Sequence, residues 1–185
     1  MIAHDFLILR NKKKLNLIVS KKCKLNILTT KDVSKKYINW LNNYDITKYT
    51  EQSKIKHSPL KVKKFVLTKY KSKYDFLFGI FVDNNHIGNI KLGPINWKHL
   101  VSDISFFIGD KNYWGKGIAS EAVKKVVKFS FTRLKLHKIN AGYYENNMPS
   151  SIVFKKCGFA IEGVRKNNII FEGKKISSIL VGKSK

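Results

Sequence analysis

Two glycines stand where a predicted strand meets a predicted helix, and this junction constrains the fold more than any other segment. The strand covers Val101–Ile108 and the helix begins at Ile118, with Gly115 and Gly117 between them. Glycine allows the tight backbone conformations that such a junction needs. The first helical turn leaves N–H groups without partners at the positive end of the helix dipole. A diphosphate is the natural anion for this position, and Lys116 adds positive charge beside it.

Two other phosphate-binding motifs fit this junction less well. A P-loop requires Gly-Lys-Ser/Thr after a four-residue spacer, and that spacing is absent here. A dinucleotide-binding fingerprint requires a third glycine near the position of Ser120 and an acidic residue that closes the next strand. Glu145 is only an imperfect candidate for that acid. A nicotinamide enzyme is therefore a remote alternative.

The remaining patterns predict a mixed α/β chain in the order β-α-α-β-β-β-α-β-α-β-β. This order matches neither a plain Rossmann alternation nor an all-β protein, and it indicates a mixed sheet with helices on both faces. Asp32 is the expected cap of the first helix, and Ser58-Pro59 is the expected start of the second. The expected strands are Lys24–Leu28, Asp75–Val82, His86–Ile95, Val101–Ile108, Lys138–Tyr144, about Ala160–Phe171 and Lys174–Val181, and the expected helices run from Asp32 to about Asn43, from Pro59 to about Tyr74, from Ile118 to about Leu134 and over Pro149–Lys156.

The length of 185 residues fits one domain, for which we expect residues 16–185, preceded by an N-terminal extension over residues 1–15. No apolar run approaches the roughly 18 residues that would span a bilayer, so membrane insertion is not expected. A signal peptide is not expected either. Cys23 and Cys157 cannot form a disulfide framework, and no Cys/His cluster has metal-ligand spacing. We therefore expect a cytoplasmic protein without a metal site.

The net charge of +25 comes from 37 basic residues, nearly all of them lysine, against 12 acidic ones. Such a field attracts anions such as nucleotides or nucleic acid, and it repels polycations. Nucleic-acid binders usually add arginine and aromatic platforms, and arginine is almost absent here. A nucleic-acid partner is therefore not expected. Biased coding toward lysine is an equally good explanation of the charge.

A second constellation follows the predicted strand Lys138–Tyr144. It consists of Asn147-Met148-Pro149-Ser150 and, after a short helix, Lys156-Cys157-Gly158-Phe159. With both segments present, the chain from about Leu15 onward resembles the GNAT superfamily of N-acetyltransferases. The resemblance is to the branch with ribosomal-protein and amino-sugar acetyltransferases. In that family, Q/R-x-x-G-x-G/A binds the CoA pyrophosphate and N-x-x-S…K-x-G-F follows the next strand. Asn112 departs from the glutamine or arginine that begins the first motif.

This resemblance implies a GNAT-like fold, in which the sheet is splayed between the strand ending at Ile108 and the strand Lys138–Tyr144. Acetyl-CoA is then the acetyl donor. Its pantetheine arm pairs with free backbone groups in the splay, and its pyrophosphate binds the glycine-rich loop. The residues implied to bind the donor are Phe107, Ile108, Gly109, Asn112, Gly115, Lys116, Gly117, Ile118, Ala119, Ser120, Asn147 and Lys156.

Direct transfer to an amine requires a base for the ammonium and a proton for the leaving thiolate. Asp103 is the first candidate for the base, although it is equally well explained as a structural carboxylate. Glu51 and Glu145 follow, and Glu51 is also the candidate for orienting the substrate amine.

Many family members donate the proton from a tyrosine four residues before the glycine of K-x-G-F, where this chain has Phe154. Ser150 is the favoured replacement, and Tyr143 is a further candidate. The alternative role of Ser150 is that of a helix N-cap, which Asn147 could also fill.

The acceptor favoured by the net charge is an anionic small molecule with a primary amine, such as a nucleotide-linked amino sugar for surface polysaccharides. The segment Ile87–Asn96 resembles that group of acetyltransferases. The alternative acceptor is the N-terminal amine of a ribosomal or other protein. Two alternatives without catalysis are an RNA-binding domain and a CoA-sensing domain. A homodimer stays open.

Overall fold

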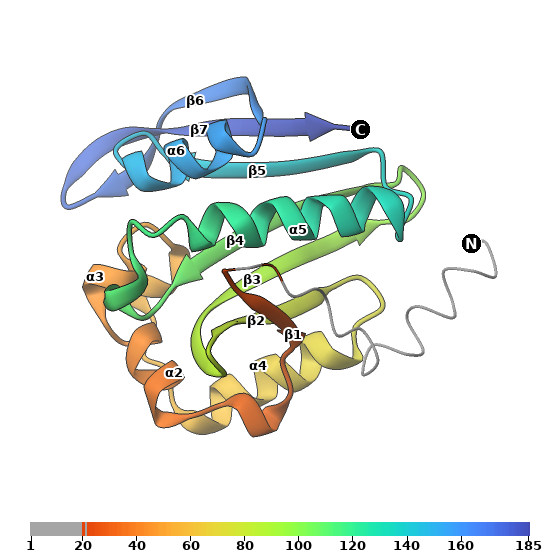
Figure 1. Ribbon diagram of the computed structural model, residues 1–185. Helices are drawn as coiled ribbons and strands as arrows, with labels where there is room; N and C mark the ends of the chain where they lie inside the picture. The colour runs from red at the N-terminus through yellow and green to blue at the C-terminus, as the bar shows by residue number, and fades with distance from the viewer. Residues whose placement is uncertain (1–19, 21) are drawn as a thin grey trace.

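The computed structural model, which describes Ser20 and residues 22–185, contains one seven-stranded sheet in the order β1-β2-β3-β4-β5-β7-β6 (Figure 1). Only β4 and β5 run parallel; the other neighbours are antiparallel. The predicted mixed α/β class is confirmed, and so is the predicted element order apart from one additional short helix between the first two strands. The predicted extension over residues 1–15 lies outside the described residues. The strands are β1 Lys24–Ile27, β2 Phe76–Val82, β3 Asn85–Asn96, β4 Val101–Ile108, β5 Lys138–Tyr144, β6 Ala160–Phe171 and β7 Lys174–Ser184; the helices are α2 Lys35–Leu41, α3 Tyr44–Thr47, α4 Pro59–Lys71, α5 Ile118–Thr132 and α6 Met148–Lys156, with short 3-10 helices η2 Thr30–Asp32, η3 Glu51–Lys54 and η4 Lys111–Tyr113.

Helices cover both faces of the sheet, as the pattern predicts. Side chains alternate between the two faces along each strand. On β2, Phe76, Phe78 and Ile80 enter the larger core, which contains the buried side of α5. Leu77 and Phe81 belong to the smaller core beneath α2 and α4. In Figure 1, α5 lies along β4, whereas α2 and α4 lie together on the side of β1 and β2.

The segment between β1 and α4 differs from the single helix expected from Asp32 to Asn43. Ser34 caps α2, whereas Asp32 forms a capping box with Thr29 in η2. Asn43 then caps the separate short helix α3. The expected cap at Ser58 is confirmed at the start of α4. Several polar residues able to cap a helix lie close together here, and each terminates or begins a short element.

The sheet opens between β4 and β5. The two strands pair only over Val101–Asp103 and Lys138–Asn140, although β4 continues to Ile108 and β5 to Tyr144. Over its whole length β5 pairs with β7 on its other side. The expected splay is therefore present, and it begins directly after Asp103.

Gly109, at the end of β4, provides a test of how tightly this region is packed. A Cβ atom at this position would overlap the indole ring of Trp40. We expect Gly109→Ala to lower the free energy of unfolding by about 1–3 kcal/mol, because the smaller core would have to move Trp40. Urea denaturation measures the loss.

Gly163→Ala is the matched control, because its added Cβ would meet Leu180 Cδ1 at an ordinary 3.7 Å. We expect that variant to stay within about 0.5 kcal/mol of the parent protein. Equal stability of the two variants would contradict the proposed contact.

Candidate functional site

The loop between β4 and α5 leads into a helix whose N-terminus has no side-chain cap. Gly115 and Gly117 have φ angles of 74° and 75°, in the left-handed region that favours glycine. Gly117 is the N-cap residue of α5, and no side chain of the described residues caps it. The N–H groups of Ile118, Ala119 and Ser120 consequently have no partner within the helix. This backbone arrangement is suited to an anion.

Two lysine side chains, those of Lys22 and Lys116, lie at this loop. Lys22 donates a hydrogen bond from Nζ to the carbonyl of Lys116 at 3.4 Å, which brings a residue distant in sequence to the loop. The ammonium of Lys116 lies 5.4 Å from the ring centroid of Tyr113. Asn112 is engaged through its backbone N–H, which donates to Asp110 Oδ1 at 3.1 Å. The sequence pattern contains no signal that places Lys22 here.

The residues of β4 whose backbone groups face the splay are shifted by one position from the expected residues. Gly109 donates its N–H to the carbonyl of Ile87 at 2.8 Å. In an antiparallel pair, residues whose backbone groups bond to the neighbouring strand alternate with residues whose backbone groups point to the opposite edge. In the observed register Phe107 therefore pairs with β3, as Gly109 does, whereas Phe106 and Ile108 turn their backbone groups toward the splay. The expectation of free backbone groups at Phe107 and Gly109 is corrected, and Phe106 is the residue that it missed.

One backbone group of this edge has a partner. The indole Nε1 of Trp114 donates to the carbonyl of Ile108 at 2.8 Å, although Trp114 is 46% exposed. The N–H groups of Phe106 and Ile108 remain directed at the splay. An extended chain placed there can pair with them as a short strand would.

Hydroxyl groups gather where β5 leads into α6. Tyr143 stacks on Phe154, with ring planes 18° apart and centroids 6.1 Å apart. Its hydroxyl donates to Ser151 Oγ at 3.3 Å. Asn147 caps α6 by accepting the N–H of Ser150 at 3.3 Å. The Ser150 hydroxyl itself makes no hydrogen bond with the part of the chain that the structure describes, so the cap role belongs to Asn147.

Asp103 lies on the sheet face opposite α5. Its neighbour Ile104 is buried in the larger core, so alternation directs Asp103 to the face of α2 and α4, which we call the α4 face. The carboxylate is exposed and makes no hydrogen bond or ion pair within residues 22–185. The surrounding protein nevertheless raises the pKa of Asp103 by partial desolvation, an effect that the positive charge of Lys91 opposes.

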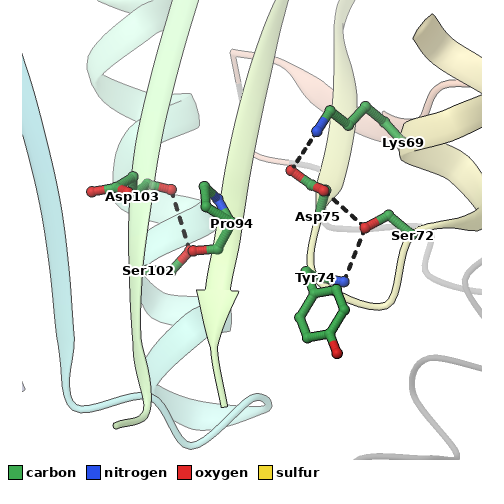
Figure 2. A network of polar contacts seen from close by, with 7 residues as sticks. All are labelled: Lys69, Ser72, Tyr74, Asp75, Pro94, Ser102 and Asp103. Carbon is green, nitrogen blue, oxygen red and sulfur yellow. Dashed lines mark hydrogen bonds and ion pairs between the residues drawn. The ribbon is translucent and has the colours of Figure 1, made fainter. Parts of the chain in front are cut away.

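Figure 2 contrasts Asp103 with another carboxylate, Asp75. Asp75 is buried and bonded, with Lys69 at 3.0 Å and the Ser72 hydroxyl at 2.8 Å. The dashed contact at Asp103 in the figure involves only its backbone carbonyl, which accepts from Ser102 Oγ at 3.3 Å. Of the two, Asp103 is the carboxylate whose side chain is available for chemistry.

Glu51 belongs to a set of contacts that closes across the open end of the splay. It accepts a hydrogen bond from the Tyr144 hydroxyl at 2.6 Å, and both burial and this carboxylate raise the pKa of Tyr144. Tyr49 stacks on Phe171, with centroids 5.3 Å apart and planes 7° apart. Together these contacts join α3 and η3 to the end of β5 and to the turn between β6 and β7. We call the set the aromatic clasp: Tyr44, Tyr49, Glu51, Tyr144, Phe171 and Glu172, the first and last joined by a 2.9 Å hydrogen bond.

The other candidate carboxylate has a structural partner. Glu145 accepts the backbone N–H of Ser177 through Oε1 at 2.7 Å and so ties the end of β5 to β7. This contact favours a structural role over that of a base. Tyr143 packs against the larger core, so alternation along β5 directs Tyr144 to the α4 face. Glu51 is bonded to Tyr144 and therefore lies on that face as well. Among the candidate bases, Asp103 and Glu51 are thus the two carboxylates on the α4 face beside the splay.

The cysteines lack the environment of a nucleophile. Burial raises the pKa of both Cys23 and Cys157. Cys157 Sγ donates to the carbonyl of Ser120 at 3.3 Å, which places the neighbouring Lys156 beside the first turns of α5. Among the described residues no group of three or more His, Cys, Asp or Glu side chains could hold a metal ion, and no helix is long and apolar enough to cross a membrane.

Comparisons with known proteins agree with this geometry. Residues 24–160 match the acetyltransferase (GNAT) domain family. A probable N-acetyltransferase of Bacillus subtilis, YjcK, is 36% identical over 113 residues, which cover 58% of this chain and 62% of the relative. The spermidine N(1)-acetyltransferase of Escherichia coli is 28% identical over 96 residues, or 52% of this chain and 51% of that one. The alignments thus span from about half to less than two thirds of these relatives.

Solved structures share the fold at low sequence identity. The spermidine N-acetyltransferase of Vibrio cholerae, in complex with CoA and spermine, has a TM-score of 0.80 at 23% identity, covering 89% of this chain and 96% of the other. The ribosomal L7/L12 alpha-N-protein acetyltransferase RimL, in complex with coenzyme A, has a TM-score of 0.82 at 17% identity, covering 91% and 97%. The seven-stranded mixed sheet is therefore that of the GNAT fold.

The cap assignment in α6 can be tested by stability alone. We expect Asn147→Ala to lower the free energy of unfolding by about 1 kcal/mol, because the first turn of α6 loses its side-chain acceptor. Ser150→Ala removes only a hydroxyl without a partner and should stay within about 0.5 kcal/mol. Denaturant unfolding of both variants measures the difference, and a larger loss for Ser150→Ala would reverse the assignment.

Proposed function

Because this chain belongs to the GNAT acetyltransferase family, we propose that it transfers an acetyl group from acetyl-CoA to a primary amine. The observation that carries this proposal is the uncapped start of α5 beside the splay. Loop and splay lie on consecutive segments of the chain, at the end of β4. Together they offer an anion site and an open strand edge to one elongated ligand.

The residues present fit the donor. The N–H groups of Ile118–Ser120, the positive helix end and Lys116 suit a diphosphate. The N–H groups of Phe106 and Ile108 suit the amide groups of a pantetheine arm. Acetyl-CoA supplies the thioester whose carbonyl carbon is attacked. A strand-edge N–H aimed at the carbonyl oxygen can stabilise the negative charge that develops there.

The reaction requires two proton transfers besides the bond changes. The amine nitrogen forms a bond to the acetyl carbon, the carbon–sulfur bond breaks, and the sulfur leaves as a thiolate. We assign Asp103 to receive the proton of the ammonium, directly or through water, because its carboxylate is exposed, unpaired and made more basic by its raised pKa. Tyr143 and Ser150 are assigned to donate the proton that the thiolate needs.

Tyr143 is well placed for that role because of its contact with Phe154. The two rings are stacked, so the Tyr143 ring lies beside Phe154, the position at which the family resemblance implies a tyrosine. Its hydrogen bond to Ser151 directs the hydroxyl toward the first turn of α6. This arrangement supports Tyr143 as the source of the hydroxyl that Phe154 lacks.

The nature of the acceptor has two supported candidates. The net charge of +25 supports an anionic amine, such as a nucleotide-linked amino sugar. The aromatic clasp supports a cationic amine instead, because Glu51 and Glu172 bring carboxylates to the open end of the splay and aromatic faces attract ammonium groups. Relatives of this chain include spermidine acetyltransferases, which fits the second candidate. A protein N-terminus is the further alternative.

Thermal stabilisation by acetyl-CoA, followed by thiol release with a panel of amines, tests the function. The panel holds a UDP-linked amino sugar, a peptide with a free N-terminus and spermidine. We expect the parent protein to be stabilised and Gly115→Asp to bind acetyl-CoA about tenfold or more weakly, because a carboxylate would repel the diphosphate. The variant should fold, since Gly115 faces open space and aspartate tolerates its φ angle.

Gly115→Asn is the matched control, because it has nearly the same shape without the charge. Equal acetyl-CoA affinity in the aspartate and asparagine variants would contradict the diphosphate site. Binding without thiol release from any amine would indicate a CoA sensor and overturn the assigned enzyme activity.

The pH dependence of turnover tests Asp103. A base must be deprotonated, and the pKa of this carboxyl is raised, so kcat/KM of the parent protein should fall as the pH drops through that pKa. Asp103→Asn should lower kcat/KM by about 10²-fold or more and remove this acidic limb, leaving only the titration of the amine. Asp83→Asn, in the β2–β3 turn, is the control, and an unchanged acidic limb in Asp103→Asn would exclude the role.

A further inference from the structure

The outer side of α4 presents leucine and lysine side chains in one row. Val62 and Val66, one turn apart, bury the inner side of this helix in the smaller core. In Figure 1, α4 lies at the border of the molecule, so its other side faces away from the sheet. Residues spaced three and four apart share one side of a helix. On the outer side they form a row that we call the Leu-Lys stripe, and its members are all exposed: Leu60, Lys64, Leu67 and Lys71.

The Leu-Lys stripe belongs to a strongly basic part of the surface. Residues 54–74 contain eight lysines and neither aspartate nor glutamate. A solvated helix often pairs a lysine with an acidic residue one turn away, as Lys125 does with Glu121 on α5. Lys64 and Lys71 form no ion pair with any residue that the structure describes.

The carboxylate that follows this part of the chain does not neutralise the stripe. Asp75 is buried, and it pairs with Lys69 at 3.0 Å. The charge of the stripe is therefore left to be balanced by anions from outside the chain.

Exposed apolar side chains gather in the same segment. Among the described residues, thirteen large apolar side chains are exposed, and five of them lie within residues 55–74: Ile55, Leu60, Phe65, Leu67 and Tyr74. Leu60, at 78%, is the most exposed of the thirteen. Water does not favour such exposure, whereas the apolar zone of a lipid surface does. The occupant of this surface must therefore offer both negative charge and hydrocarbon.

We propose that the Leu-Lys stripe binds the surface of an anionic lipid membrane. Leu60 and Leu67 enter the boundary between headgroups and acyl chains, and the ammonium groups of the stripe meet the anionic headgroups. The aliphatic stems of Lys64 and Lys71 lie along the apolar layer while their charged ends reach the headgroups. The helix lies on the bilayer without crossing it. This inference concerns a surface separate from the splay and does not rest on the proposed acetyl transfer.

A nucleic acid is the other polyanion that a basic helix face can bind. Residues 54–74 contain no arginine, and leucine offers no face on which a base can stack. The aromatic ring of Phe65 is engaged within the helix, because the ammonium of Lys69 lies over it at 5.8 Å from its centroid. These features favour a lipid surface over RNA.

Cosedimentation of the full chain with lipid vesicles tests the proposal. The parent protein should bind vesicles of phosphatidylcholine with about one third phosphatidylglycerol at least about tenfold more tightly than vesicles of phosphatidylcholine alone. Combined Lys64→Gln and Lys71→Gln substitutions should weaken binding to the anionic vesicles about tenfold or more. Combined Leu60→Gln and Leu67→Gln substitutions should weaken it by about as much, because the leucine side chains no longer enter the apolar layer.

Two matched controls separate the stripe from general surface properties. Lys124→Gln with Lys128→Gln removes the same charge from exposed positions on α5. Ile161→Gln removes an exposed apolar side chain from β6, at the opposite edge of the sheet from β1. Both controls should keep the parent affinity within about twofold. Thermal unfolding checks that the variants fold, and the single substitutions Leu60→Gln and Lys64→Gln replace a pair that does not.

Three results would overturn the proposal. Equal binding of the parent protein to both kinds of vesicle would exclude recognition of anionic lipid. An equal loss in the α5 control would show an effect of net charge alone. Binding that needs the two lysines but not the two leucines, together with lysine-dependent binding of an RNA homopolymer, would assign the stripe to nucleic acid instead.

Discussion

The absence of pairing between β4 and β5 beyond Asp103 is the constraint on which the site depends. Backbone N–H and carbonyl groups need partners, so a sheet that opens in its middle must satisfy them by other means. β5 does so through β7 along its whole length. On β4, the Trp114 indole donates a hydrogen bond to the carbonyl of Ile108. The N–H groups of Phe106 and Ile108 face the splay and remain available to a ligand. The aromatic clasp closes the far end, so the two halves of the sheet stay joined on both sides of the opening.

Much of the fold could be predicted from local patterns, because its elements have clear boundaries. The patterns predicted β4 and β5 over the same residues that the structure assigns, Val101–Ile108 and Lys138–Tyr144. Both contain β-branched and aromatic residues, and residues that favour turns follow them, Gly109-Asp110 and Asn146-Asn147. The first helix was predicted wrongly, because Asp32 is only one of several neighbouring residues able to cap. Which of them begins a helix depends on packing against the smaller core, and local sequence does not contain that information.

In the candidate site, too, some parts could be predicted from local sequence and others could not. The loop at Gly115 could be predicted because left-handed glycines and an uncapped helix are local properties. The choice between Phe106 and Phe107 could not, because it depends on the register with β3, which shifts by a bulge between Leu92 and Ile95. A change of one residue exchanges the two edges of a strand. The aromatic clasp joins segments far apart in sequence, so no spacing pattern indicated it.

The net charge and the local charges act on different steps of recognition. A field of +25 speeds the arrival of an anionic donor and slows that of a cationic acceptor, but salt screens it beyond about 8–10 Å. Within that distance the nearest groups decide. Among these, Asp110 is held by Lys36 at 2.7 Å and Asp45 by Lys111 at 2.6 Å, so these two carboxylates fix the loop and its surroundings. Under the proposed function, Asp103 and Glu51, the latter bonded to the Tyr144 hydroxyl, are the carboxylates assigned to meet the amine. On this proposal the charges of the α4 face, and not the net charge, select the sign of the acceptor, so a strongly basic chain is compatible with a cationic substrate.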